Sequence, residues 1–182
     1  MNAQLNENHA LEQAKSQVES IVEMVAALNC DYDRLEELTE DRASLQQDID
    51  FADEPETDAA AKLALIWWDT ENAEELAALV ADAGECDSQD DAQQRIQENP
   101  LSVQVRSDWH LPSDKDNKAS EFEIMLCTGG PAVRIIGDLD EYGQPGRAHI
   151  QYQDWGTPWT DYVGHGHTDD LLTYCQQFYF GE

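Results

Sequence analysis

Apolar residues recur at alternating spacings of three and four along the first part of the chain. This spacing places them on one side of a helix. Val22 and Met24 beside this series widen the apolar side beyond that of a two-stranded coiled coil, although a coiled coil stays open as an alternative. We therefore predict one long helix over residues 11–49, packed in a hairpin or a bundle. The series, called the seam below, consists of Leu11, Ala14, Val18, Ile21, Val25, Leu28, Tyr32 and Leu35.

The side of this predicted helix that faces away from the seam is acidic. Aspartate and glutamate occupy most of its positions, and adjoining positions add further carboxylates. Such a surface suits a cationic partner. The candidate partner-binding acids are Glu12, Glu19, Glu23, Asp33, Glu36, Glu37, Glu40, Asp41 and Asp48.

A turn and a second helix are predicted next. Pro55 disfavours helix at Glu54, so residues 51–58 are interpreted as the turn of a hairpin. The second helix begins near Ala59 and ends near Gly84, with a short third helix before Pro100. The segment LALIWW in the second helix is apolar nearly all round, so we expect it to be buried on both sides and to dock the hairpin.

After Pro100, apolar residues tend to recur at every second position of the chain. Four stretches, LSVQVRSDW, EFEIMLCT, PAVRIIGDL and AHIQYQDW, are typical of strands, and segments with glycine or proline separate them. A last helix begins near Thr168. The pattern predicts an α+β fold: an acidic helical hairpin with a short helix over residues 1–99, then a four-stranded antiparallel sheet packed on a C-terminal helix over residues 100–182.

The charge of the chain narrows the range of partners. Its 182 residues include 39 acids and 10 Lys or Arg, a formal net charge of -29. Residues 1–100 hold 26 acids and 5 bases, a net of -21, so the acidity belongs mainly to the helical part. This charge argues against direct binding to nucleic acid or to an anionic membrane.

The remaining composition indicates a protein of the cytosol. Four cysteines lie far apart without a C-x-x-C pair, which is typical of free thiols in a reducing compartment. The start of the chain lacks the pattern of an export signal, and no apolar stretch is long enough to span a membrane. We expect a cytoplasmic protein, located in a host cell cytosol.

Candidate chemistry in the second half of the chain is sparse. His165 and His167 are weak candidates for metal ligands, and no motif for catalysis or for a cofactor is present, so we predict a protein that is not an enzyme. Trp155 and Trp159 flank a turn. At least one of their rings is a candidate anchor for a partner, with packing over the sheet edge as the alternative.

Three stretches, LCTGGPAVRI, YQDWGTPWT and QQFYFGE, resemble a group of uncharacterised short acidic proteins associated with bacteriophage and integrated elements. The similarity covers about residues 94–182. The resemblance implies a mobile-element setting, in which small acidic proteins often block host defence enzymes that bind DNA. It brings no known activity with it.

These observations lead to one main hypothesis and two alternatives. The chain is expected to be an inhibitor that mimics nucleic acid and occupies the basic groove of a host DNA- or RNA-binding defence protein, of the anti-CRISPR or anti-restriction type. The first alternative is an acidic coiled-coil interaction or assembly module, including a homodimer through the seam. The second, more distant alternative is a metal-dependent enzyme that uses His165 and His167. The acidic residues can also serve only to keep the surface solvated, or they can be an adaptation of the protein to high salt.

Overall fold

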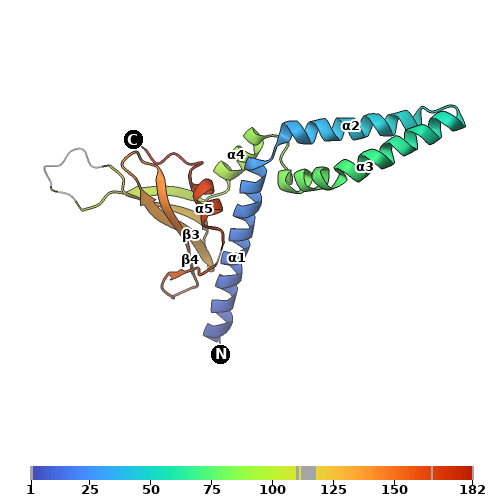
Figure 1. Ribbon diagram of the computed structural model, residues 1–182. Coiled ribbons are helices and arrows are strands. Elements are labelled where there is room, and N and C mark those ends of the chain that lie inside the picture. The colour runs from blue at the N-terminus through green and yellow to red at the C-terminus, as the bar shows by residue number, and fades with distance from the viewer. Residues whose placement is uncertain (1, 110, 112–117, 165, 182) are drawn as a thin grey trace. The chain divides into compact units, whose positions relative to one another are not determined.

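The computed structural model describes residues 2–109, 111, 118–164 and 166–181 (Figure 1). These residues form two compact units. Unit 1 combines Met1–Val25 with Ala92–Glu182, and unit 2 is Ala26–Asp91. The fold is α+β, as predicted, with helices in the N-terminal half, an antiparallel sheet and a C-terminal helix.

Five helices and five strands make up the part of the chain that the structure describes. The helices are α1 (Asn2–Asn29), α2 (Tyr32–Asp50), α3 (Pro55–Ala83), α4 (Gln89–Glu98) and α5 (Thr168–Cys175). The strands are β1 (Ser102–Arg106), β2 (Glu121–Cys127), β3 (Ala132–Leu139), β4 (Pro145–Gln153) and β5 (Thr160–Asp161).

The sheet of unit 1 is a meander in which every strand pairs with the next one in sequence. Ile124, Ile135 and Ile150 lie side by side across β2, β3 and β4. The sheet has five strands, so the predicted number of four is wrong. The additional strand, β5, pairs only two residues with β4. A strand of two residues is too short to produce a period-two pattern, which explains why the sequence did not indicate it.

The core of unit 1 lies on one side of this sheet. Buried and half-buried positions alternate in β2 and β3, so Phe122, Ile124, Val133 and Ile135 point to the same side. Side chains of α1, β4 and α5 line a small cavity of about 100 Å³, so these elements lie against one another. The seam residues Ala14, Val18, Ile21 and Val25 are buried here. The first part of the seam thus packs within unit 1.

The predicted single helix over residues 11–49 is wrong, because it is two helices. α1 ends at Asn29, and the Asp31 carboxylate then caps α2 by accepting a hydrogen bond from the backbone N–H of Arg34, at 3.0 Å. The Tyr32 hydroxyl donates to the carbonyl of Ala27, one of the last carbonyls of α1, at 3.0 Å. The aspartate side chain disfavours the interior of a helix but stabilises the start of one. Asp31 therefore favours a break between two helices at this point.

Unit 2 contains a helical hairpin formed by α2 and α3 alone. Arg34 pairs with Glu75 and Arg42 with Asp69, an order that fits antiparallel helices. Leu38 of α2 and Trp68 of α3 are buried in it. The predicted hairpin is therefore shorter than expected, and the coiled coil is not confirmed. Burial of LALIWW on both sides is wrong: Leu63, Ile66 and Trp67 are exposed, because α2 covers only one side of α3.

Candidate functional site

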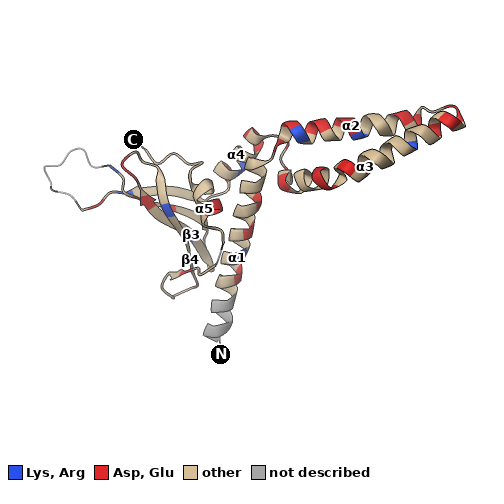
Figure 2. Cartoon of the chain, viewed as in Figure 1, with Lys and Arg blue, Asp and Glu red and all other residues tan. Residues whose placement is uncertain are grey.

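The α2–α3 hairpin, Tyr32–Ala83, carries an unusual concentration of acids. It holds 16 acidic and 3 basic residues, a net charge of -13. Acidic residues lie on both helices and in the turn between them (Figure 2). All of these carboxylates are exposed except those of Asp58 and Asp69, which are half-exposed. The hairpin thus presents nearly all of its negative charge to solvent.

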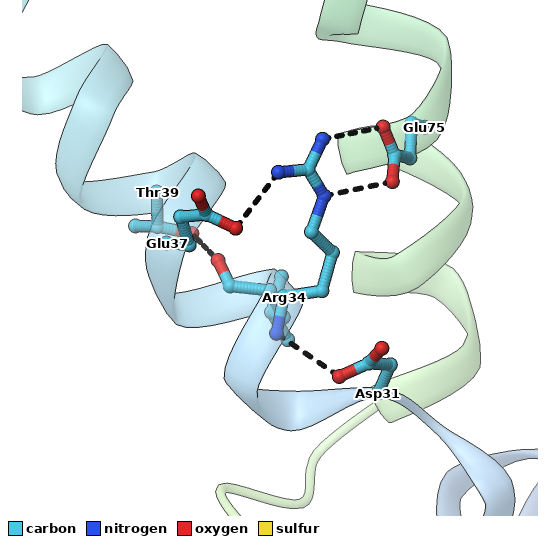
Figure 3. A network of polar contacts seen from close by, with 6 residues as sticks. Asp31, Arg34, Glu37, Thr39 and Glu75 are labelled. Carbon is cyan, nitrogen blue, oxygen red and sulfur yellow. Dashed lines mark hydrogen bonds and ion pairs between the residues drawn. The ribbon is translucent and has the colours of Figure 1, made fainter.

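Arg34 is the best-connected base of the hairpin (Figure 3). Its Nε and Nη2 donate to the two carboxylate oxygens of Glu75 at 2.9 and 3.0 Å, and its Nη1 donates to Glu37 at 2.8 Å. The hydrogen bond from Arg34 is the main reason that the pKa of Glu75 lies below its ordinary value. The same two carboxylates raise the pKa of Arg34. This guanidinium joins α2 to α3.

The other two bases of the hairpin are also paired. Arg42 of α2 lies 2.9 Å from Asp69 of α3, and Lys62 lies 2.8 Å from Asp58 one turn before it. Four carboxylates therefore share ion pairs with three bases, including those of Glu37 and Glu75, which both pair with Arg34. Among the described residues, the other twelve hairpin carboxylates form no ion pair. They are those of Asp33, Glu36, Glu40, Asp41, Asp48, Asp50, Asp53, Glu54, Glu56, Glu71, Glu74 and Asp82.

The linear charge density of the hairpin can be compared with that of DNA. α3 has 29 residues, which corresponds to a length of about 44 Å at about 1.5 Å per residue. A net charge of -13 over this length is one negative charge per about 3.4 Å. One strand of B-DNA also carries one charge per about 3.4 Å of helix axis. The hairpin alone thus reaches the charge density of a single strand.

The predicted partner-binding acids are divided between two helices. Glu12, Glu19 and Glu23 are exposed on the part of α1 that belongs to unit 1. The remaining six are exposed on α2, in unit 2, so the predicted stripe is not carried by one helix. The α2 group consists of Asp33, Glu36, Glu37, Glu40, Asp41 and Asp48.

The two candidate tryptophans differ in their surroundings. Trp155 is 77% exposed, and it lies so close to Gly130 that a Cβ atom there would come within 1.8 Å of the indole Nε1. Trp159 is half-buried, with the guanidinium carbon of Arg134 4.1 Å from its ring centroid. Arg134 also donates to Gln151 and forms an ion pair with Glu123. Two of the motifs noted in the sequence, LCTGGPAVRI and YQDWGTPWT, thus meet at Gly130 and Trp155.

The candidate residues for metal or nucleophilic chemistry are dispersed. His165 lies outside the described residues, and His167 lies 3.5 Å from Asp170. The described part of the chain contains no group of three or more His, Cys, Asp or Glu residues that could hold a metal ion. Burial raises the pKa of the Cys127 and Cys175 thiols, which lowers the fraction of reactive thiolate.

The sequence interpretation missed the outward side of α3 as a candidate surface. Leu63, Ile66, Trp67 and Val80 are all more than half exposed there. One signal could have revealed it: the second half of the predicted first helix has few apolar residues, too few to cover α3 all round. Despite these apolar residues, none of the helices that the structure describes combines the length and apolarity needed to cross a membrane.

Comparisons of the chain with protein-family models, with curated proteins and with solved structures gave no match.

Proposed function

We propose that the chain is a non-enzymatic inhibitor whose α2–α3 hairpin mimics nucleic acid and occupies the basic groove of a host DNA- or RNA-binding defence protein. The observation that supports this best is the uncompensated charge of the hairpin, one net negative charge per about 3.4 Å. All three of its bases are already paired within the hairpin. We propose an inhibitor of the anti-CRISPR or anti-restriction type, in keeping with the mobile-element setting that the sequence resemblance implies.

Inhibition would follow from competition for the same cationic residues. Lys and Arg side chains that line a nucleic-acid groove are held close to phosphates, and binding releases the counterions around those charges. A hairpin of similar charge density offers the same electrostatic attraction through carboxylates. Because the attraction is ionic, complex formation is expected to weaken steeply as the salt concentration rises.

The alternative function is an acidic interaction or assembly module that does not imitate nucleic acid. The exposed apolar residues on α3 favour this alternative, because charge mimicry alone does not need them. A homodimer through the seam would first have to expose Ala14, Val18 and Ile21, which are buried in unit 1. Competition distinguishes the two functions: duplex DNA displaces a mimic from its partner but leaves an assembly module bound.

Plating of phage on bacteria tests the proposed function. The strains carry either a restriction system or a CRISPR effector, and the full chain is expressed in them. The protein is expected to raise the plating efficiency of a targeted phage in at least one strain. The double variant Glu36→Lys/Glu40→Lys reverses two exposed, unpaired charges one turn apart on α2. We expect the increase in plating efficiency to be at least tenfold smaller with this variant than with the wild type.

A matched variant controls for the change in net charge. Glu19→Lys/Glu23→Lys reverses two exposed glutamates with the same spacing on α1, outside the hairpin. This variant should keep the activity of the wild type. Equal loss in both variants would show that only the total charge matters, and full activity of the Glu36→Lys/Glu40→Lys variant would contradict mimicry by the hairpin. No protection in any strain would also count against the proposal.

A further inference from the structure

The outward side of α3 carries an apolar series with heptad spacing. Successive members are four and three residues apart in alternation, which keeps them on one side of the helix. A separate series, with Leu65 and Trp68 among its members, faces α2 and is buried or half-buried. The exposed series, called the outer stripe, consists of Ala59, Leu63, Ile66, Thr70, Ala73, Ala77 and Val80, with Trp67 beside Ile66.

The large side chains of the outer stripe are exposed to an extent that is unusual for apolar residues on a helix. Leu63 is 67% exposed, Ile66 62%, Trp67 69% and Val80 53%. They lie on one helix within three heptads rather than scattered singly over the surface. Contiguous apolar groups of this kind, bordered by charged residues, mark interaction sites in soluble proteins. An aromatic residue such as Trp67 is also the residue type that most often anchors an interface.

The spacing of the outer stripe suits a helix as the occupant. A partner helix can place its own side chains between members of the stripe in a knobs-into-holes arrangement. Small residues at Ala59, Ala73 and Ala77 allow the two backbones to approach closely at both ends. Leu63, Ile66 and Trp67 supply the large apolar contact between them. An amphipathic helix laid along an apolar helix surface is a recurring mode of peptide recognition.

The charges around the outer stripe favour a basic partner over a second copy of the chain. Glu56, Glu71 and Glu74 lie along its border, exposed and without an ion pair among the described residues. The nearest lysine, Lys62, is engaged by Asp58. Pairing two such stripes would bring acidic borders together, and like charges that face each other across an interface are unfavourable. Lysine or arginine next to the apolar residues of a partner would instead pair with these glutamates.

We infer that the outer stripe of α3 binds an amphipathic helix of the partner protein, with leucine-like residues on one side and Lys or Arg on the borders of that side. This inference rests on the proposed function for the basic character of the partner. It adds a specific contact to the general attraction of the hairpin. The inhibitor would therefore recognise one basic protein among many by the apolar residues that accompany its cationic groove.

A synthetic peptide tests the inference with the full chain. The probe is a peptide of three heptads, the length of the outer stripe from Ala59 to Val80, with leucine along one side and lysine elsewhere. Fluorescence anisotropy of the labelled peptide measures its affinity. A second peptide, with glutamine in place of leucine, keeps the charge and lacks the apolar side. We expect the second peptide to bind at least tenfold more weakly.

Two matched tryptophan variants locate the site. Trp67→Gln removes the largest residue of the outer stripe and Trp109→Gln removes another exposed indole, in unit 1. Both side chains are exposed, and glutamine is a good helix former, so the helical circular dichroism signal should stay unchanged. Affinity for the leucine–lysine peptide should fall at least tenfold in the Trp67→Gln variant and stay at the wild-type value in the Trp109→Gln variant.

Several results would overturn the inference. They are equal binding of the two peptides, equal affinity of the two tryptophan variants, or no binding of the leucine–lysine peptide to the wild type. Sedimentation of the peptide-free protein provides another: a dimer that the Trp67→Gln variant abolishes would make a second copy the occupant. If phage protection depends on Glu36 and Glu40 but not on Trp67, mimicry stands and the inferred contact is wrong. If neither variant affects protection, both proposals fail.

Discussion

Arg34 of α2 and Glu75 of α3 form a bidentate ion pair across the hairpin, with N–O distances of 2.9 and 3.0 Å. Together with the Arg42–Asp69 pair, it joins two helices whose unpaired charges are acidic. Since both side chains are partly exposed, the pair acts in a screened environment, and its main effect is to fix how the two helices align. Its loss should therefore be detectable as a local loosening of unit 2.

Glu75→Gln is expected to destabilise the hairpin at neutral pH. The pKa of Glu75 is lowered in the folded state, so the ion pair stabilises the hairpin above the pKa of the unfolded carboxyl group. This contribution disappears as the pH falls through the folded pKa, because a protonated Glu75 no longer pairs with Arg34. Thermal unfolding followed by circular dichroism should show a difference between wild type and variant that vanishes as the pH falls through the lowered pKa of Glu75.

A neighbouring residue provides the control for this measurement. Glu74 is exposed and lies next to Glu75 but has no ion pair among the described residues. Glu74→Gln removes one negative charge without removing a contact, so it should leave the hairpin as stable as before or stabilise it slightly. If Glu74→Gln and Glu75→Gln lower the stability equally at neutral pH, the Arg34 pair is not the cause.

Salt is expected to stabilise the hairpin, in contrast to the usual weakening of surface ion pairs. Twelve unpaired carboxylates repel one another, whereas only three bases form attractive pairs. The Debye length falls from about 30 Å at 0.01 M to about 10 Å at 0.1 M, which screens the more numerous long-range repulsions first. The melting temperature of the helical signal should rise over this range. A constant or falling value would show that the repulsion is unimportant for folding.

The sequence predicts some features of this fold well and others poorly, for physical reasons. Strands β2 and β3 have strict alternation because one side of each faces the core, and their positions follow directly from that pattern. The break after Asn29 depends on the Asp31 side chain acting as a cap rather than as a surface acid. Aspartate fits either role, and the seam continues through the break, so periodicity did not reveal it.

The candidate site shows a similar limit. The acidity of α2 is evident from composition, because charged residues at this density stay in solvent. The exposure of Ile66 and Trp67 depends on how many apolar residues the facing helix offers, which is a property of the hairpin rather than of α3. A pattern that is apolar nearly all round predicts burial only when another element is available to cover each side.

Gly130→Ala is expected to displace Trp155. Gly130 has a φ of 105°, and an added Cβ atom would lie 1.8 Å from the indole Nε1. The substitution therefore combines backbone strain with a steric clash, and a cost of about 1–3 kcal/mol in the free energy of unfolding is expected. The indole N–H signal of Trp155 in an NMR spectrum should shift. Gly129→Ala separates the two effects, since Gly129 has a similar φ of 120° with open space around it. It should show the strain without the displacement of Trp155.

Leu38→Ala is expected to unfold the hairpin far more readily than Ile66→Ala. Leu38 is 1% exposed and Ile66 is 62% exposed, so truncation leaves a cavity at the first position and none at the second. The expected loss in the free energy of unfolding is about 2–5 kcal/mol for Leu38→Ala and below about 0.5 kcal/mol for Ile66→Ala. Amide hydrogen exchange measures the free energy of unfolding of α2 and α3 separately from that of the sheet. A separate measurement is needed because the chain has two compact units. Faster exchange in the Ile66→Ala variant would mean that Ile66 stabilises the hairpin itself, and the outer stripe would then be part of the fold rather than a surface for a partner.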